Sequence, residues 1–135
     1  MYASTLRGDP AAVYRAVDVA SRVQSASPHR LIVLLYEDLD VALRQAAFAI
    51  DRRQFEIKSS RITKALAILF ALEAGLDFTK GGEVAETLSR LYRGARTELT
   101  NAGVAGDAEA IRAVAANIGE IAAAWRQIEE QRAAA

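Results

Sequence analysis

The sequence contains no cysteine, which excludes both a disulfide framework and a thiolate metal site. It contains a single histidine, His29, so one chain cannot supply the paired Glu-x-x-His motifs of a di-iron helical bundle. No apolar run approaches the roughly 18 residues that a membrane-spanning helix needs. Residues 1–6 also lack the charged and apolar regions of a secretory signal, so we expect a cytoplasmic protein without membrane insertion.

An excess of charge of one sign is also missing. Seventeen basic residues balance seventeen acidic ones, and the basic residues are scattered along the chain. A basic stripe that would bind the phosphates of DNA or RNA is therefore absent from the pattern, and we do not expect nucleic acid as a partner.

The sequence has no motif that usually carries catalysis. No strand–turn–helix elbow frames a serine, and cysteine and a second histidine are missing as nucleophile or base. The pair Gly81-Gly82 follows a lysine, whereas a P-loop places its lysine after the glycines, so we interpret the pair as a turn. A small-molecule enzyme would need several arginines to converge, and pairing with acidic residues one turn away explains them better. These arginines are Arg61, Arg90, Arg93, Arg96 and Arg126. We therefore predict no catalytic residue, no cofactor and no metal ion.

Amphipathic helices account for most of the chain. With 135 residues, 52% hydrophobic and 25% charged, it suits one globular domain. We predict a mobile arm with a short helical segment in residues 1–26, and a single helical domain in residues 27–132. Within that domain, apolar residues recur at helical spacing in four segments with short connections, and no segment alternates as a strand does. The pattern predicts an all-α fold, an antiparallel up-down four-helix bundle.

The first long helix has a sharply defined start, because Ser27 suits the N-cap and Pro28 the first helical position. Its core face is predicted to carry Ile32, Tyr36, Leu39, Leu43, Ala46 and Ile50. On nearly the opposite side, Leu34, Val41 and Phe48 recur every seven residues between charged side chains. This narrow apolar line, the outer ridge, is typical of a surface that contacts a second helix.

The other three helices follow from turn residues and apolar stripes. The second runs from Phe55 to about Leu76, and Gly81-Gly82 suits the turn after it. The third is predicted over about residues 83–102, and Asp107 supplies the N-cap of the fourth. The predicted core faces of the third and fourth helices carry Val84, Leu88, Leu91, Tyr92, Ala95, Leu99, Ile111, Val114, Ala115, Ile118, Ile121, Ala122, Trp125 and Ile128.

Several sequence blocks occur in an order typical of one known family. They are Ser25-Ala26-Ser27-Pro28-His29-Arg30-Leu31-Ile32, Leu34-Leu35-Tyr36-Glu37, Gly75-Leu76-Asp77, Lys80-Gly81-Gly82-Glu83-Val84-Ala85 and Ala124-Trp125-Arg126-Gln127-Ile128. From about Tyr14 to Ile128 the chain thereby resembles the flagellin export chaperone family, the FliS type. That family commonly has glycine where this chain has Asp38, so we expect the path of a bound client to differ there.

The resemblance implies a cytoplasmic four-helix bundle that binds the disordered C-terminal segment of flagellin and prevents its premature polymerisation. It also implies delivery of flagellin to the export gate of the flagellar type III export apparatus. The N-terminal segment with Tyr14 would cover part of the client site when flagellin is absent. Together with the helical pattern, the resemblance gives as candidate client-binding residues Leu31, Leu34, Leu35, Val41, Phe48, Tyr92 and Trp125.

These candidates also have alternative interpretations. The outer ridge would be covered equally well by the N-terminal segment or by a second copy in a homodimer. Leu31, Leu35, Tyr92 and Trp125 also suit the bundle core, although an aromatic ring can serve both with its opposite faces. For the whole protein, the alternative is a homodimeric helical adaptor with a different client, which co-expression with flagellin would distinguish from a flagellin chaperone.

Overall fold

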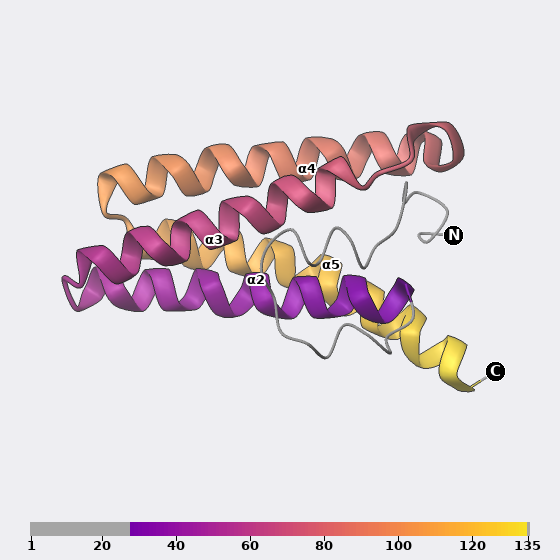
Figure 1. Cartoon of the computed structure of the whole chain (residues 1–135), viewed down its shortest axis with the longest axis horizontal. Coiled ribbons are helices and arrows are strands. Elements are labelled where there is room, and N and C mark those ends of the chain that lie inside the picture. Colours follow the sequence, from indigo (N-terminus) through magenta and orange to yellow (C-terminus); the bar gives the residue numbers. More distant parts are fainter. Residues whose placement is uncertain (1–27, 135) are drawn as a thin grey trace.

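The structure, a computed structural model, describes residues 28–134, with the side chains of residues 30–124, 126 and 127. Four helices make up this part of the chain: α2 (Pro28–Asp51), α3 (Phe55–Ala74), α4 (Phe78–Ala105) and α5 (Ala108–Ala134). Successive helices run in opposite directions and pack against each other, and α5 returns to pack against α2 (Figure 1). This arrangement confirms the predicted all-α bundle. No helix within residues 28–134 has the length and hydrophobicity that a membrane span requires.

Of the predicted capping residues, Asp107 lies in the described part of the chain, whereas Ser27, like the predicted arm of residues 1–26, lies outside the described residues. Asp107 caps α5 as predicted, since its Oδ1 accepts a hydrogen bond from the backbone N–H of Ala110 at 3.0 Å. Before α4, Asp77 Oδ1 likewise accepts from two backbone N–H groups of the following turn. A first helical turn of α4 therefore begins at Phe78. The helical backbone breaks at Gly82, where φ is +52°, a value that favours glycine, and the continuous helix follows from about residue 83, as predicted.

Among the described side chains, helix α2 contributes more buried residues to the core than any other helix, and it is buried on every side over residues 31–36. Residues 31–36 are all at most 3% exposed, and beyond them only one face of the helix remains buried. The hydroxyl groups of Tyr36 and Tyr92 are hydrogen-bonded to each other in this core. Because Tyr92 belongs to α4, this bond links two helices that lie diagonally across the bundle, and it satisfies two polar groups that would be costly to bury alone.

Helices α3 and α4 approach each other closely at Gly103. A Cβ atom at this position would lie only 2.8 Å from Cδ1 of Ile62. The carbonyl oxygen of Gly103 also accepts a hydrogen bond from Nζ of Lys58 at 3.2 Å. Because Gly103 has no side chain, the backbone of α4 comes within reach of the side chains of Ile62 and Lys58 on α3.

A carboxylate joins the same two helices further along. Glu73 of α3 accepts hydrogen bonds from Arg96 at 2.5 Å and from the buried Ser89 at 2.9 Å, and Arg93 lies 3.3 Å away. Burial alone would raise the pKa of Glu73, but the hydrogen bonds from Arg96 and Ser89 and the two arginine charges outweigh it and lower the pKa. The ionised form of Glu73 is therefore favoured in the folded state.

We expect Glu73→Gln to lower the stability of the bundle at pH 7 by about 1–3 kcal/mol, because hydrogen bonds to a charged group are lost. The folded pKa lies below the unfolded one, so the stabilisation is present above the unfolded pKa and is lost as pH falls through the folded value. Thermal melts from pH 7 to pH 3 should show a smaller acid-induced decrease in Tm for the variant than for the wild type. Glu86→Gln, at an exposed glutamate of α4, is the control, and equal pH profiles for Glu73→Gln and the wild type would contradict the prediction.

Candidate functional site

Large apolar side chains on the outside of the bundle mark the candidate binding surfaces. Among the described side chains, those that are exposed are Val41, Phe48, Phe55, Ile57, Phe70, Phe78, Val84, Leu91 and Val104. Several of them line shallow hollows between neighbouring helices: one between α2 and α3, one between α3 and α4, and one between α4 and α5. Hollows between helices suit the side chains of a further helix laid along the bundle.

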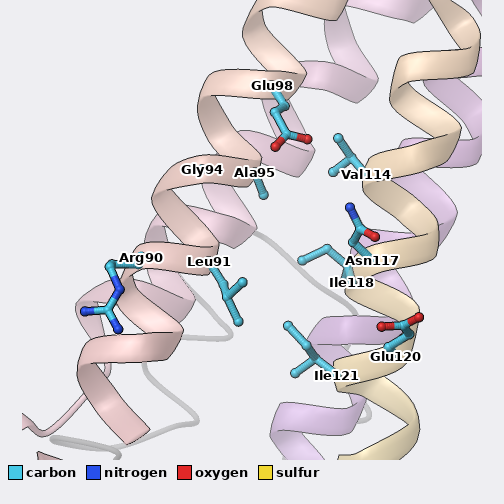
Figure 2. A pocket seen from close by; sticks show the side chains of 10 residues that line it. All are labelled: Arg90, Leu91, Gly94, Ala95, Glu98, Val114, Asn117, Ile118, Glu120 and Ile121. Carbon is cyan, nitrogen blue, oxygen red and sulfur yellow. The ribbon is translucent and has the colours of Figure 1, made fainter. Parts of the chain in front are cut away.

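The hollow between α4 and α5 has an apolar floor and a charged rim. Figure 2 shows Leu91 of α4 opposite Ile118 and Ile121 of α5, with their side chains directed into the space between the helices. Arg90 and Glu120 lie on opposite sides of this space. The two helices meet at the α4–α5 connection and are well separated at their other ends (Figure 1), which leaves Leu91 47% exposed.

The hollow between α2 and α3 lies beside the end of the outer ridge. Phe48 of α2 and Ile57 of α3 supply its apolar part, and they are 54% and 45% exposed. The guanidinium of Arg52 lies 4.8 Å from the centre of the Phe48 ring, a cation–π distance. The remaining lining residues are Arg44, Gln45, Gln54 and Arg61.

The hollow between α3 and α4 is built around Phe70, which is 62% exposed. Leu66 lies one turn before it on α3, and Arg96 places its guanidinium 5.6 Å from the ring centre. Arg96 also binds Glu73, so this arginine connects an exposed ring to a partly buried ion pair. The hollow is therefore bordered on one side by the ion pair of Arg96 with Glu73 and on the other by the exposed ring of Phe70.

Comparison with known proteins identifies the family. The sequence model described as "Flagellar protein FliS" matches residues 10–132. The chain belongs to the FliS family. It is 40% identical over 116 residues to the flagellar secretion chaperone FliS of Salmonella typhimurium, which covers 85% of this chain and 86% of that protein. It is 36% identical to the flagellar secretion chaperone FliSB of Pseudomonas aeruginosa, covering 83% and 89%, and 32% identical to FliS of Vibrio cholerae, covering 85% of each.

Membership of the FliS family confirms the resemblance found in the sequence and assigns the chain to flagellar secretion chaperones rather than to enzymes. Arg61, Arg90 and Arg96 line three different hollows. The partners of the arginines differ in part from those predicted: Arg96 pairs with Glu73, and Arg126 lies 4.0 Å from Glu37, each on another helix. Pairing within one helix holds for Arg44 with Asp40. The long arginine side chain reaches across a helix interface as readily as along one helix.

The structure places the predicted client-binding residues in two environments. Val41 and Phe48 are about half exposed, as predicted for the outer ridge of this FliS family member. Leu31, Leu35 and Tyr92 are buried in the core, at 3%, 0% and 1% exposure, which agrees with their alternative interpretation. Trp125 lies on α5, but its side chain is outside the described part of the structure, and Tyr14 lies outside the described residues altogether.

The prediction that Leu34 faces outward on the ridge is wrong. Leu34 is only 3% exposed and belongs to the core cluster. The reason is local composition: residues 31–36 are apolar or aromatic around the whole circumference of α2, and such a helix segment is stable only when it is buried on every side. The exposed ridge therefore consists of Val41 and Phe48.

Two surface residues of α4 were assigned to the core from the sequence and are exposed instead. Val84 and Leu91 were placed on one stripe with Leu88 and Tyr92, yet they are 52% and 47% exposed. At 100° per residue they lie next to each other at one edge of that stripe, whereas the buried residues occupy its centre. Their position at the edge of the stripe was the feature of the sequence that could have indicated their exposure. Ile57 and Phe70 carry no comparable sequence signal of a binding role.

Proposed function

We propose that this protein is a cytoplasmic export chaperone that binds the disordered C-terminal segment of flagellin and prevents its premature polymerisation. The observation that carries the proposal is the FliS family match over residues 10–132, in a bundle whose outer surface has apolar hollows between its helices. The relatives from Salmonella typhimurium and Vibrio cholerae are themselves named flagellar secretion chaperones.

The hollows suit a client that folds as it binds. Ordering a disordered chain costs conformational entropy, so the complex has to bury on the order of 1,000–3,000 Å². A single hollow between two helices is too small for that burial. A client that forms helices along several hollows, with apolar side chains at i, i+3, i+4 and i+7, would bury enough surface.

Val41 and Phe48 are the proposed direct contacts on α2, because their side chains are accessible. Leu31, Leu34, Leu35 and Tyr92 can contact a client only if binding uncovers them. The proposed covering role of Tyr14 and the client contact of Trp125 rest on the family resemblance.

Two further parts of the proposal concern partners other than flagellin. The chaperone would deliver flagellin to the export gate of the flagellar type III export apparatus. Without its client it would form a homodimer, because a second copy would shield the exposed apolar side chains. Co-expression with flagellin tests the competing proposal of an adaptor with a different client, since a flagellin chaperone should co-purify with flagellin.

Calorimetric titration with the flagellin C-terminal segment at several temperatures tests the proposed function. Burial of a large apolar surface should give saturable binding with a large negative heat-capacity change. The control is the same segment with its apolar residues replaced by serine, for which we expect no binding heat. Absence of binding by the unaltered segment would overturn the proposal.

A further inference from the structure

The hollow between α2 and α3 combines an apolar surface with positively charged side chains. Its apolar part consists of Phe48 and Ile57, and its charged lining residues are Arg44 and Arg61. Among the described residues that line this hollow, none has an acidic side chain. A ligand that fills this hollow therefore meets an apolar surface next to positive charge.

The two arginines differ in how well they are already paired. Arg44 is held by Asp40, whose two carboxylate oxygens both lie 3.0 Å from its Nε. Arg61, in contrast, has a buried Nε with no hydrogen-bond partner within the described part of the chain. It also forms no ion pair there, although its side chain is half-buried. An unpaired buried donor is unfavourable, and native proteins rarely leave one without a role.

We propose that this hollow binds an acidic amphipathic helix of the flagellin client, with an apolar side chain between Phe48 and Ile57 and a carboxylate on Arg61. The inference rests on the proposed chaperone function and specifies the chemistry of one part of the client. The bound segment carries aspartate or glutamate three or four residues away from the apolar side chain.

The spacing follows from the geometry of α3. Ile57 and Arg61 are four residues apart, so they lie one above the other on the same face of the helix. A client helix aligned with α3 presents an apolar and an acidic side chain at the same separation. Arginine favours a carboxylate because its planar guanidinium donates two parallel hydrogen bonds to the two oxygens.

The test compares three variants of the full-length chain by calorimetric titration with the flagellin C-terminal segment. Arg61→Gln removes the charge, and we expect an affinity roughly ten-fold lower than that of the wild type, with a weaker dependence on salt. Arg61→Lys keeps the charge and should recover part of the loss. Arg44→Gln is the matched control in the same hollow, and because Asp40 already neutralises Arg44 we expect a change below about three-fold.

A double-mutant cycle then identifies the carboxylate. Each aspartate or glutamate of the segment is changed singly to asparagine or glutamine, and one of these changes should weaken binding to the wild type but not to Arg61→Gln. Circular dichroism melts should show that Arg61→Gln folds as the wild type does.

The possible failures are distinguishable. If the wild type does not bind the segment, the proposed function itself is wrong. If the wild type binds and Arg61→Gln binds equally well, the chaperone function stands and the carboxylate site is overturned. Sedimentation of both proteins over a range of concentrations tests whether a second copy of the chain fills the hollow instead. If the wild type is a dimer and Arg61→Gln is a monomer, the hollow belongs to a dimer interface and the inference is overturned.

Discussion

Replacing Phe48 by aspartate should reduce the affinity for the flagellin C-terminal segment by about thirty-fold or more while leaving the bundle folded. Phe48 is 54% exposed, so the free protein loses little packing when its ring is removed. In the complex, a buried aromatic contact is typically worth about 2 kcal/mol or more, and a carboxylate in its place would also have to lose water. Calorimetric titration gives the affinity, and a circular dichroism melt gives the stability.

Val104→Asp is the matched control for this experiment. Val104 is the most exposed large apolar side chain in the described part of the chain, at 87%, and it lines none of the hollows described above. The variant adds the same charge to the surface without touching the proposed client path, so its affinity should equal that of the wild type. Unchanged client binding by Phe48→Asp would remove the α2/α3 hollow from that path.

Replacing Leu34 by aspartate should have a different outcome, namely loss of the fold. Leu34 is 3% exposed in the core cluster, and an unpaired carboxylate there loses its hydration without gaining a partner. A penalty above about 4 kcal/mol is expected, against a total stability of about 5–15 kcal/mol for a domain. The measurement is the helical circular dichroism signal at 25 °C together with the Tm.

Val41→Asp provides the comparison, because Val41 lies seven residues further along the same side of α2 and is 51% exposed. This variant should melt within a few degrees of the wild type, whereas Leu34→Asp should melt far below it or be unfolded. A Leu34→Asp protein that melts like the wild type would return Leu34 to the outer ridge. The pair thus measures where the exposed ridge ends.

Most of the fold was predictable because it depends on interactions between residues that are close in sequence. Pro28 at a helix start and Asp107 as an N-cap act through the backbone of their own turn. The apolar stripes likewise follow from the period of the α-helix. The short turn of α4 that Asp77 caps before Gly82 was not predicted, because the paired glycines dominated the sequence signal.

The candidate site was predictable only in part. Helical periodicity gives the direction in which each side chain points from the helix axis. It does not give how much of the helix circumference the neighbouring helices cover. Leu34 and Leu91 show the two errors that follow: the first was predicted exposed and is buried, and the second was predicted buried and is exposed.

The sequence by itself therefore determined the four helices, the start of α2 at Pro28, the cap at Asp107, the absence of catalytic motifs and membership of the FliS family. The tertiary structure alone decided which apolar edges remain open and which charges remain unpaired. The close approach of Gly103 to Ile62 depends on residues of different helices, far apart in the chain. The same holds for Nε of Arg61, which has no hydrogen-bond partner among the described residues. Such relations arise only when the helices pack, because the angle and separation of two helices are set by all the side chains at their interface.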